Sequence, residues 1–309
     1  MAPCWSAAAV AVAAVAAAGA AASVPADVGT AAVPGLTWGV AVAAPHTSAG
    51  FVVAASTAGA FTVNASVIAW ACYNDTIPTT GWARLDVHSR PWYGAYSDEL
   101  QAMAAGYLEG VLTQQRSWEY VTNAFTDQEL PDNLTSYLTT NLDYVAQQVA
   151  TNPGDAYWHQ VGLVFTQLRG LYAGYNAPAP PAQALPFLRF YTATLSGDLD
   201  DLNSVFELEP PAASAHSDGH CSLIVKTIGD SYAPDELYIA HTTWSRYECM
   251  TRVYKMYDFA WSVNGNPATG VVPAQQMAFS SYPAALYRCV ASYGNGHGHV
   301  QSHASTSHP

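Results

Sequence analysis

Short apolar runs separated by turn residues fill the first part of the chain. They are Trp38–Val42, Gly50–Ala54, Ala60–Val63 and Val67–Trp70. The segment 81–89 follows as a further strand, in which Trp82, Leu85 and Val87 are the apolar members. Strand-length runs bounded by turn residues are typical of an antiparallel meander, so we predict a sheet in this region.

The pattern changes to helical spacing after Ser97, which is a suitable N-cap with Asp98 and Glu99 behind it. Apolar residues then recur every three or four positions, at Leu100, Met103, Ala104, Tyr107, Leu108 and Val111. We expect this stripe to pack against the sheet. Glu109 could be a site carboxylate, but we favour a solvated residue on the outer side of the helix.

Three more helical patterns follow, at 132–150, 155–175 and 185–203, and the proline-rich segment 178–186 separates the last two as a loop. A final helix is predicted over 246–257, because Tyr247, Met250, Val253, Tyr254 and Tyr257 recur at helical spacing. Strands first, helices next, and then a new hairpin and helix indicate a layered α+β protein.

Composition narrows the class of protein. The 309 residues could form one large domain or two small ones. A net charge of −13 with only ten Lys and Arg argues against a nucleic-acid partner, whose phosphates need cationic cover. After the N-terminus there is no run of about 20 apolar residues, so we predict no transmembrane span.

The N-terminus indicates a secretory route. Residues 1–23 hold a continuous run of small apolar residues that ends in Ala-Ala-Ala-Ser, as in a cleaved signal peptide, although no Lys or Arg precedes it. Low-complexity alanine or a signal anchor is the alternative. Sequons at Asn64, Asn74 and Asn133 predict glycosylation and agree with a secreted or lysosomal location.

Cysteine usage is compatible with that route. Cys4 would leave with the signal peptide, and Cys72, Cys249 and Cys289 allow at most one disulfide among them. We find no C-x-x-C motif and no spacing typical of zinc ligands, so we predict neither a metal nor another cofactor.

Cys221 is the strongest candidate for chemistry. The polar, proline-bearing segment 210–220 reads as an exposed linker, and Cys221 opens the strand-like run 221–228 directly after it. Cleavage between His220 and Cys221 would give this cysteine a free α-amine, with a pKa near ~7.7–8.0, that could act as base for its own thiol. The alternative is a buried structural thiol.

A second strand-like run, 236–243, follows a turn segment. If the two runs form a hairpin, Cys221 lies opposite Thr243 and Leu223 opposite His241. Strand alternation then puts Cys221, His241 and Thr243 on one face, with His241 as the diagonal neighbour of Cys221. A register slip of one residue would undo this arrangement.

Five segments resemble the phospholipase B-like family of N-terminal-nucleophile hydrolases. They are HCSLIVK (220–226), ELYIAHTTWSRYECMTRVYKMYDF (236–259), GWARLDVHS (81–89), AYSDELQAMAAGYLEGVLT (95–113) and FSSYP (279–283). The resemblance implies an αββα sandwich made of a small and a large chain after internal cleavage. It also implies that Cys221 is the nucleophile and that His241 and Trp244 line the site.

The resemblance divides the chain into a small-chain part (24–209), a cleavage segment (210–220) and the start of a large chain (221–283). The tail 284–309 does not continue the family pattern, and its histidine-rich, low-complexity end is predicted to be disordered. We therefore expect the C-terminal part of the sandwich to be incomplete and the chain as written to be poorly active.

These patterns and the resemblance predict a secreted or lysosomal hydrolase that releases fatty acyl chains from phospholipids through a Cys221 acyl-enzyme. Trp244 would wall the pocket, His241 would bind near the amine or the oxyanion, and Thr243 would support them. Two alternatives stay open: an amidase that acts on a non-peptide carbon–nitrogen bond, and an inactive secreted glycoprotein that keeps the scaffold.

Overall fold

The computed structural model describes residues 39–46, 50–56, 67–89, 96–125, 130–206, 221–227, 237–243, 247–286, 290–294 and 301–305. The strands are β1 (Gly39–His46), β2 (Gly50–Ser56), β3 (Ala69–Asp75), β4 (Trp82–His88), β5 (Cys221–Thr227), β6 (Leu237–Thr243), β7 (Arg252–Asp258), β8 (Gln276–Ser281), β9 (Val290–Gly294) and β10 (Gln301–Ser305). The helices are α1 (Ile77–Thr80), α2 (Asp98–Ala124), α3 (Asp132–Thr151), α4 (Ala156–Asn176), α5 (Phe187–Thr194) and α6 (Ser196–Val205). Short 3-10 turns lie at Pro181–Gln183, Tyr247–Cys249 and Pro267–Thr269.

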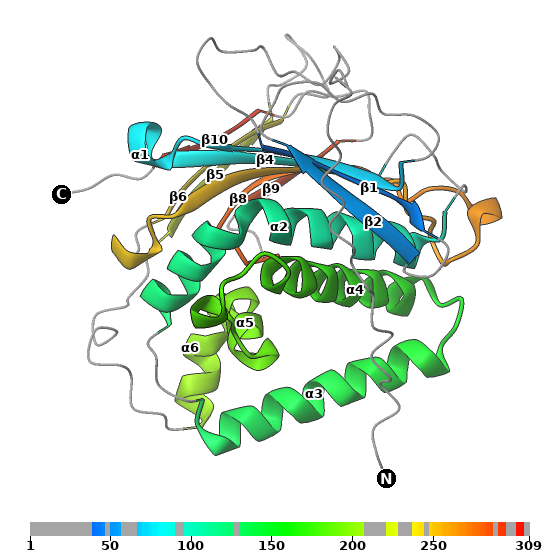
Figure 1. Ribbon diagram of the computed structural model, residues 1–309, viewed down its shortest axis with the longest axis horizontal. Helices are drawn as coiled ribbons and strands as arrows, with labels where there is room; N and C mark the ends of the chain where they lie inside the picture. The colour runs from blue at the N-terminus through cyan, green and yellow to red at the C-terminus, as the bar shows by residue number, and fades with distance from the viewer. Residues whose placement is uncertain are drawn as a thin grey trace.

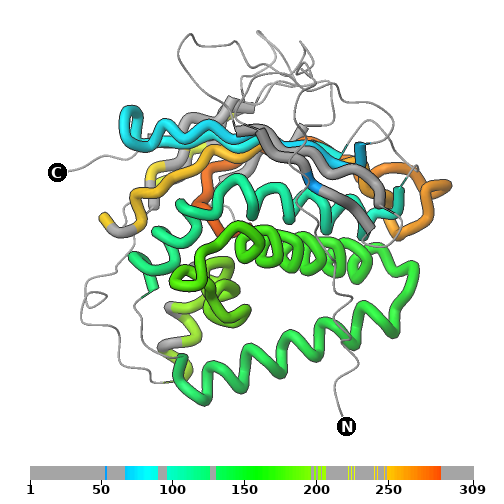
Figure 2. The backbone as a smooth tube through the Cα atoms, in the orientation of Figure 1, coloured from blue at the N-terminus to red at the C-terminus, as the bar shows by residue number. Residues whose placement is uncertain are grey.

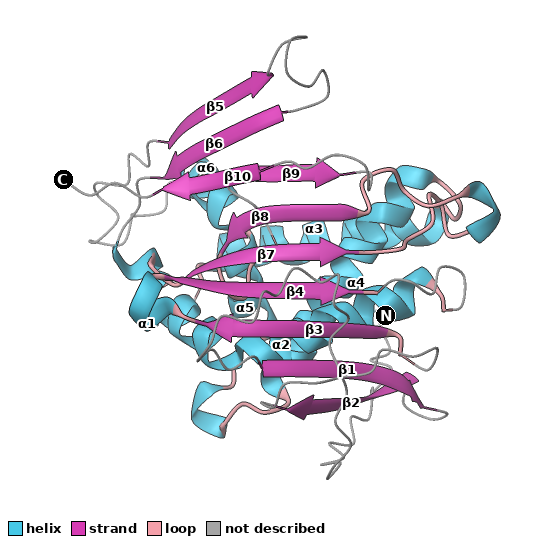
Figure 3. Ribbon diagram, turned by 90° about the horizontal axis from the view of Figure 1, so that it is seen from above, coloured by secondary structure: helices cyan, strands magenta, loops and turns pink. Residues whose placement is uncertain are grey.

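The strands form two sheets. Seven strands join in the order β2-β1-β3-β4-β7-β8-β9, and three more in the order β10-β6-β5 (Figure 3). The predicted antiparallel sheet is confirmed in β1 to β4, but these strands do not form a simple meander, because β1 lies between β2 and β3 and β2 is at the edge. The central pair β4–β7 is parallel, so the large sheet is mixed. The expected α+β class is confirmed.

The helices cover one face of the large sheet. Figure 1 shows α2 directly beneath the strands, α4 beneath α2, and α3 outermost on the same side. The tube in Figure 2 follows the same layers from the sheet down to α3. The N-cap of α2 is the predicted one, because the side chain of Ser97 accepts a hydrogen bond from the backbone N–H of Leu100.

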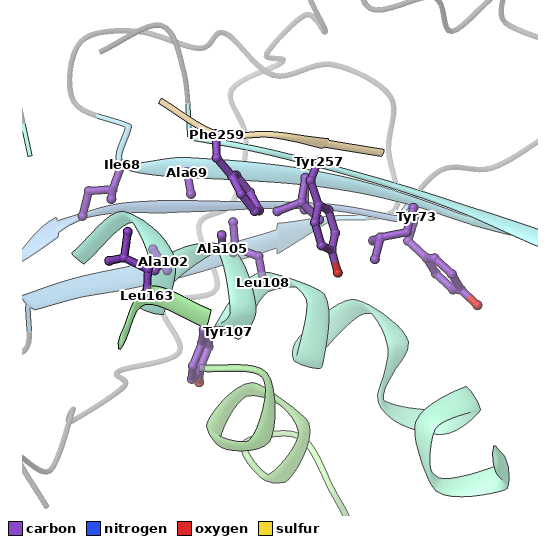
Figure 4. Packing of buried hydrophobic residues seen from close by; sticks show 14 of the residues in the cluster. Ile68, Ala69, Tyr73, Ala102, Ala105, Tyr107, Leu108, Leu163, Tyr257 and Phe259 are labelled. Atoms are coloured by element: carbon purple, nitrogen blue, oxygen red, sulfur yellow. The ribbon is translucent and has the colours of Figure 1, made fainter. Parts of the chain in front are cut away.

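The core lies in two parts on either side of α2. One cluster joins the sheet to the upper side of the helix, where Ala102, Ala105 and Leu108 meet Ile68 and Phe259 (Figure 4). The predicted apolar stripe is confirmed only in part, because Leu108 packs against the sheet whereas Met103 and Tyr107 lie on the side of the helix that meets α4. The second cluster fills the space between α2, α4 and α5, with Tyr120, Leu171, Tyr175 and Phe190 among its buried members.

Helices α2 and α4 touch backbone to backbone, and glycines make this possible. A Cβ atom at Gly106 would lie 1.9 Å from the carbonyl oxygen of Gln167, and one at Gly110 would lie 2.2 Å from that of Leu171. The same holds for two glycines of α4. A Cβ atom at Gly170 would lie 2.3 Å from a carbonyl oxygen of α2, and one at Gly174 would lie 2.0 Å from another. No side chain fits into this contact, so the four glycines set the distance between the two helices.

The predicted helix over 246–257 is wrong. Residues 247–249 form a 3-10 turn, and Arg252–Asp258 is the strand β7, which pairs with β4 and β8 in the middle of the sheet. Burial alternates along it, with Val253, Lys255 and Tyr257 toward the helices. Lys255 is a polar residue on the buried face, so the alternation of apolar and polar residues expected of a strand is absent from the sequence. Aromatic residues on both faces of the strand give a spacing that resembles that of a helix.

The prediction of a disordered tail also differs from the structure. Two strands lie in this region: β9 pairs antiparallel with β8, and β10 pairs parallel with β6. The low-complexity composition gave no sign of these strands. Small and polar residues can nevertheless add a strand to a sheet when the neighbouring strand has unpaired backbone groups. The signal segment 1–23, the linker 210–220 and the sequon residue Asn64 lie outside the described residues.

Ala284 is held in the left-handed region, with a φ of 62° and no exposed surface. An L-residue with a Cβ atom is strained there, whereas glycine is not. Relief of about 1–2 kcal/mol of left-handed strain, reduced by the entropic cost of about 0.5–1 kcal/mol that glycine brings, should raise the free energy of unfolding of Ala284→Gly by about 0.5–1 kcal/mol. Urea denaturation measures this change. A destabilised variant would mean that contacts of the Ala284 methyl group outweigh the backbone strain.

Candidate functional site

The hairpin β5–β6 has the predicted register. Cys221 is the first residue of β5 and pairs with Thr243, while Leu223 pairs with His241. Because side chains alternate along a strand, Cys221, His241 and Thr243 belong to one face of the hairpin, with His241 diagonal to Cys221. Trp244 and His220 lie just outside the described strands.

The opposite face of the hairpin is open to solvent. Ser222, Ile224, Lys226 and Ala240 are all exposed, and Ile224 keeps 66% of its surface accessible. β5 is the outer strand of its sheet among the described strands, and β6 lies between it and β10. The first residue of β5 therefore stands at a strand end on the edge of this sheet.

Glu109 is not a solvated helix residue, contrary to the sequence interpretation. Its carboxylate has no exposed surface and accepts hydrogen bonds from Lys255 Nζ at 2.7 Å and from the hydroxyl of Tyr257 at 2.6 Å. Lys255 Nζ also donates to the backbone carbonyl of Ala285 at 2.6 Å. This network ties helix α2 to strand β7 and to the segment that follows β8.

The surroundings of the network change the acidity of its members. Burial lowers the pKa of Lys255, and the nearby Glu109 only partly opposes this. Burial and then the Glu109 charge raise the pKa of Tyr257 well above its usual value. Because all three side chains are closed off from solvent, we assign the network to the architecture of the protein rather than to substrate chemistry.

Asp98, His159 and Ser262 form a second polar cluster whose residue types match a hydrolase triad. Its geometry does not, because the carboxylate is in the centre. Asp98 Oδ2 accepts from the Ser262 hydroxyl at 2.5 Å and from its backbone N–H at 2.9 Å, and it lies 2.9 Å from His159 Nε2. Among these described side chains, no hydrogen bond joins the serine to the histidine, so a base next to the serine hydroxyl is missing.

This cluster fastens α2, α4 and the loop after β7 together. Burial pushes the pKa of Asp98 up, but hydrogen bonds from His159 and Ser262 outweigh it, and the pKa lies below its usual value of 3.8. A carboxylate with a depressed folded-state pKa stabilises the protein above its unfolded-state pKa, and this contribution is lost as pH falls through the folded-state pKa.

We therefore expect Asp98→Asn to lower the free energy of unfolding at pH 7 by about 1.5–3 kcal/mol, the contribution typical of hydrogen bonds to a charged group. The difference from the wild type should shrink as the pH is lowered below about 4. Urea denaturation across pH measures it, with the exposed Asp143→Asn as matched control. A difference that is constant with pH would contradict a role for the charge.

The sheet face turned away from α2 carries a polar layer. Arg84 pairs with Asp86 at 3.0 Å, and His88 Nδ1 lies 3.5 Å from Asp258. The ring of Trp70 stacks on His88 with centroids 3.9 Å apart. Asp86 is only 1% exposed, so this face is more enclosed than an open sheet surface.

Other sequence candidates can be placed as follows. Cys72 is a free thiol in β3 that is 1% exposed, and burial together with Asp86 raises its pKa to about 12, so it is protonated and unsuited to nucleophilic attack. The pairing among Cys72, Cys249 and Cys289 stays open, because Cys289 is outside the described residues. Asn133 is exposed at the start of α3, whereas Asn74 is 6% exposed within β3, which disfavours a glycan at that position.

The described residues support neither a metal site nor a transmembrane helix. No three His, Cys, Asp or Glu side chains gather there closely enough to hold a metal ion. Of the helices in those ranges, none combines the length and apolarity that a membrane crossing requires.

The arrangement defines an α+β protein with a cysteine and a histidine on one face of an edge hairpin. Residues 69–289 match the sequence model of the Phospholipase B family, and the chain belongs to this family. The match begins before and ends after the segments recognised in the sequence, and it takes in Cys221, His241 and Trp244.

Curated relatives agree with this assignment. The chain is 35% identical to "Phospholipase B-like protein B" of Dictyostelium discoideum over 234 residues, which are 71% of this chain and 39% of that protein. It is 32% identical over 240 residues to "Phospholipase B-like protein D" of the same organism, covering 72% of this chain and 40% of the relative. The chain thus spans about two fifths of the length of these relatives.

Proposed function

We propose that the chain carries the nucleophile of a cysteine N-terminal-nucleophile hydrolase that releases fatty acyl chains from phospholipids. The observation that carries the proposal is the strand pairing. It starts β5 at Cys221 and puts His241 on the same face, one diagonal step away. The names of the relatives support a phospholipid substrate.

The reaction follows from the two groups that a processed Cys221 would hold. Its α-amine takes the thiol proton, and the thiolate adds to the ester carbonyl of the substrate. Collapse of the tetrahedral intermediate forms the thioester and breaks the carbon–oxygen bond, and the leaving alkoxide takes the proton from the ammonium group. Water, deprotonated by the same amine, then hydrolyses the thioester to release the fatty acid and the thiol.

Neighbouring residues would assist these steps. His241 would donate a hydrogen bond near the amine or toward the developing oxyanion, a type of interaction whose loss costs on the order of 10²–10³ in turnover. Thr243 would support this geometry, and Trp244 would wall the acyl pocket. We assign no metal or other cofactor to the reaction, because a cysteine with its own base requires none.

The proposal includes an αββα sandwich, in which a second sheet covers the polar layer of the large one. The low exposure of Asp86 and the stacked Trp70–His88 pair support a covered face. It also includes cleavage between His220 and Cys221 in a secreted or lysosomal protein, with the two fragments staying associated. The exposed sequon at Asn133 supports the secretory route.

Cleavage is tested by N-terminal sequencing of the purified protein. The wild type should give a fragment that starts Cys-Ser-Leu-Ile-Val-Lys, and Cys221→Ala should remain one chain because its first step, attack by the thiol on the preceding carbonyl, is lost. Cys249→Ala is the matched control and should be processed normally. Normal processing of Cys221→Ala would refute self-cleavage.

Substrate class is tested on the cleaved material. Release of fatty acid from a diacyl phospholipid should be faster than release from an N-acyl amide and should be abolished in Cys221→Ala. Faster cleavage of the amide would reassign the site to an amidase. Because the chain as written is expected to be poorly active, the assay also uses protein extended to the length of its relatives, and turnover of neither substrate by the fully cleaved extended protein would reject the hydrolase.

A further inference from the structure

The hairpin formed by α3 and α4 presents three aromatic side chains close to its turn. The ring of Trp158 has Tyr157 at 5.0 Å and Tyr144 at 6.2 Å between centroids, and both pairs are nearly perpendicular, with interplanar angles of 77°. Tyr157 is 67% exposed and Tyr144 is 52% exposed. We call these three residues the aromatic corner.

Packing among the described residues leaves much of the aromatic corner exposed. Helix α3 buries only Leu134 and Leu138, both in its first two turns, and lies outermost in the helical layer (Figure 1). Tyr137, in the first half of the helix, differs from the aromatic corner because its ring packs against that of Phe206, with centroids 5.5 Å apart. At the other end of the helix, Tyr144 meets only the half-buried Trp158 among the ring contacts of the described residues.

The stretch of sequence that contains the aromatic corner carries acidic but no Lys or Arg side chains. Between Arg116 and Arg169 the sequence has no Lys or Arg, but it has the six acidic residues Glu119, Asp127, Glu129, Asp132, Asp143 and Asp155. Asp143 directly precedes Tyr144, and Asp155 lies two positions before Tyr157. Both are exposed. The potential at this surface therefore favours a cation and disfavours an anionic lipid surface.

Exposed aromatic rings next to carboxylates suit one kind of cation in particular. A quaternary ammonium group has no N–H to donate and is weakly hydrated. It is therefore stabilised mainly by contact with aromatic ring faces, whereas a primary ammonium is stabilised by hydrogen-bond acceptors. Tyrosine and tryptophan also favour the boundary between water and lipid, because each has an apolar body and a polar tip.

We propose that the aromatic corner binds the trimethylammonium headgroups of choline phospholipids at a membrane surface. Tyr144, Tyr157 and Trp158 supply the ring faces, and Asp143 and Asp155 supply the negative potential. The contact is separate from the hairpin β5–β6, so it would attach the protein to the membrane whether or not the chain hydrolyses the lipid.

The proposal is tested by cosedimentation of the full chain with vesicles of diether phosphatidylcholine, which no acyl hydrolase can cleave. We expect binding to these vesicles, weaker binding when phosphatidylethanolamine replaces most of the lipid, and none to phosphatidylglycerol. Free phosphocholine should compete. Tyr157→Leu should weaken binding about fivefold or more, because leucine keeps an apolar side chain but loses the ring face, whereas Tyr157→Phe should keep binding.

Tyr137→Leu is the matched control, since it removes an exposed tyrosine of α3 outside the aromatic corner, and it should bind within about twofold of the wild type. Thermal unfolding of each variant shows that the hairpin is intact. Unchanged binding of Tyr157→Leu, equal binding to both zwitterionic lipids, or no binding to phosphatidylcholine would each overturn the proposal.

Discussion

Gly174→Ala is expected to prevent stable folding, or to lower the free energy of unfolding by more than about 3 kcal/mol. The new Cβ atom would lie 2.0 Å from the carbonyl oxygen of Tyr107, and the next nearest atoms are also backbone. Backbone cannot rotate away as a side chain can, so α2 and α4 must separate and open both parts of the core. Denaturation in urea, followed by circular dichroism, measures the loss.

Gly162→Ala in the same helix is the matched control. Its Cβ atom would approach only Val149 Cγ1, at 3.0 Å, and that side chain can move. Alanine also favours the helix over glycine by about 1 kcal/mol, so we expect a stability close to that of the wild type. Equal losses in the two variants would show that helix packing tolerates neither change and that backbone contact is not the cause.

Glu109→Gln is expected to cost about 3–5 kcal/mol, because it leaves Lys255 buried without a counter-charge. The amide keeps the size of the side chain and can still accept from Tyr257, so the loss reports on charge rather than on volume. Glu99→Gln is the matched control, because Glu99 is an exposed residue of the same helix. It should change the free energy of unfolding by less than about 0.5 kcal/mol.

Adding Lys255→Met to Glu109→Gln should recover much of the loss, because the double variant no longer buries an unpaired charge. Full denaturation curves of the two single variants and the double variant give the coupling between the residues. If the losses simply add, the two side chains do not act as a pair in the folded state.

The sequence was sufficient for elements whose pattern is local. The strands β1 to β4 and the N-cap at Ser97 were predicted close to where they lie, since turn residues and capping chemistry act over a few positions. The order in which the strands pair, with β1 between β2 and β3, was not predicted. β7 was mistaken for a helix because Lys255 occupies its buried side, and only a carboxylate 146 positions away makes that acceptable. A partner so distant leaves no trace in a short window.

The candidate site was predictable in its register but not in its surroundings. The pairing of Cys221 with Thr243 followed from two strand-like runs around one turn segment. The polar cluster of Asp98, His159 and Ser262 was missed, because its members come from three elements. An aspartate and a histidine 61 positions apart carry no recognisable spacing. The sequence offered one signal for this cluster, the charged Asp98 in the first turn of α2. A favourable interaction with the helix N-terminus explained that residue equally well.

If the chain is cut as proposed, the parallel pairing of β4 with β7 bears on when the cut can occur. Arg252 donates to the carbonyl of Gly81, 171 positions earlier, and the His220–Cys221 bond lies between these two residues. Within one chain the two strands meet at a high effective concentration, but as separate fragments they would have to find each other by diffusion. Cleavage should therefore follow folding, and fragments 1–220 and 221–309 produced separately should assemble only slowly and in a concentration-dependent way.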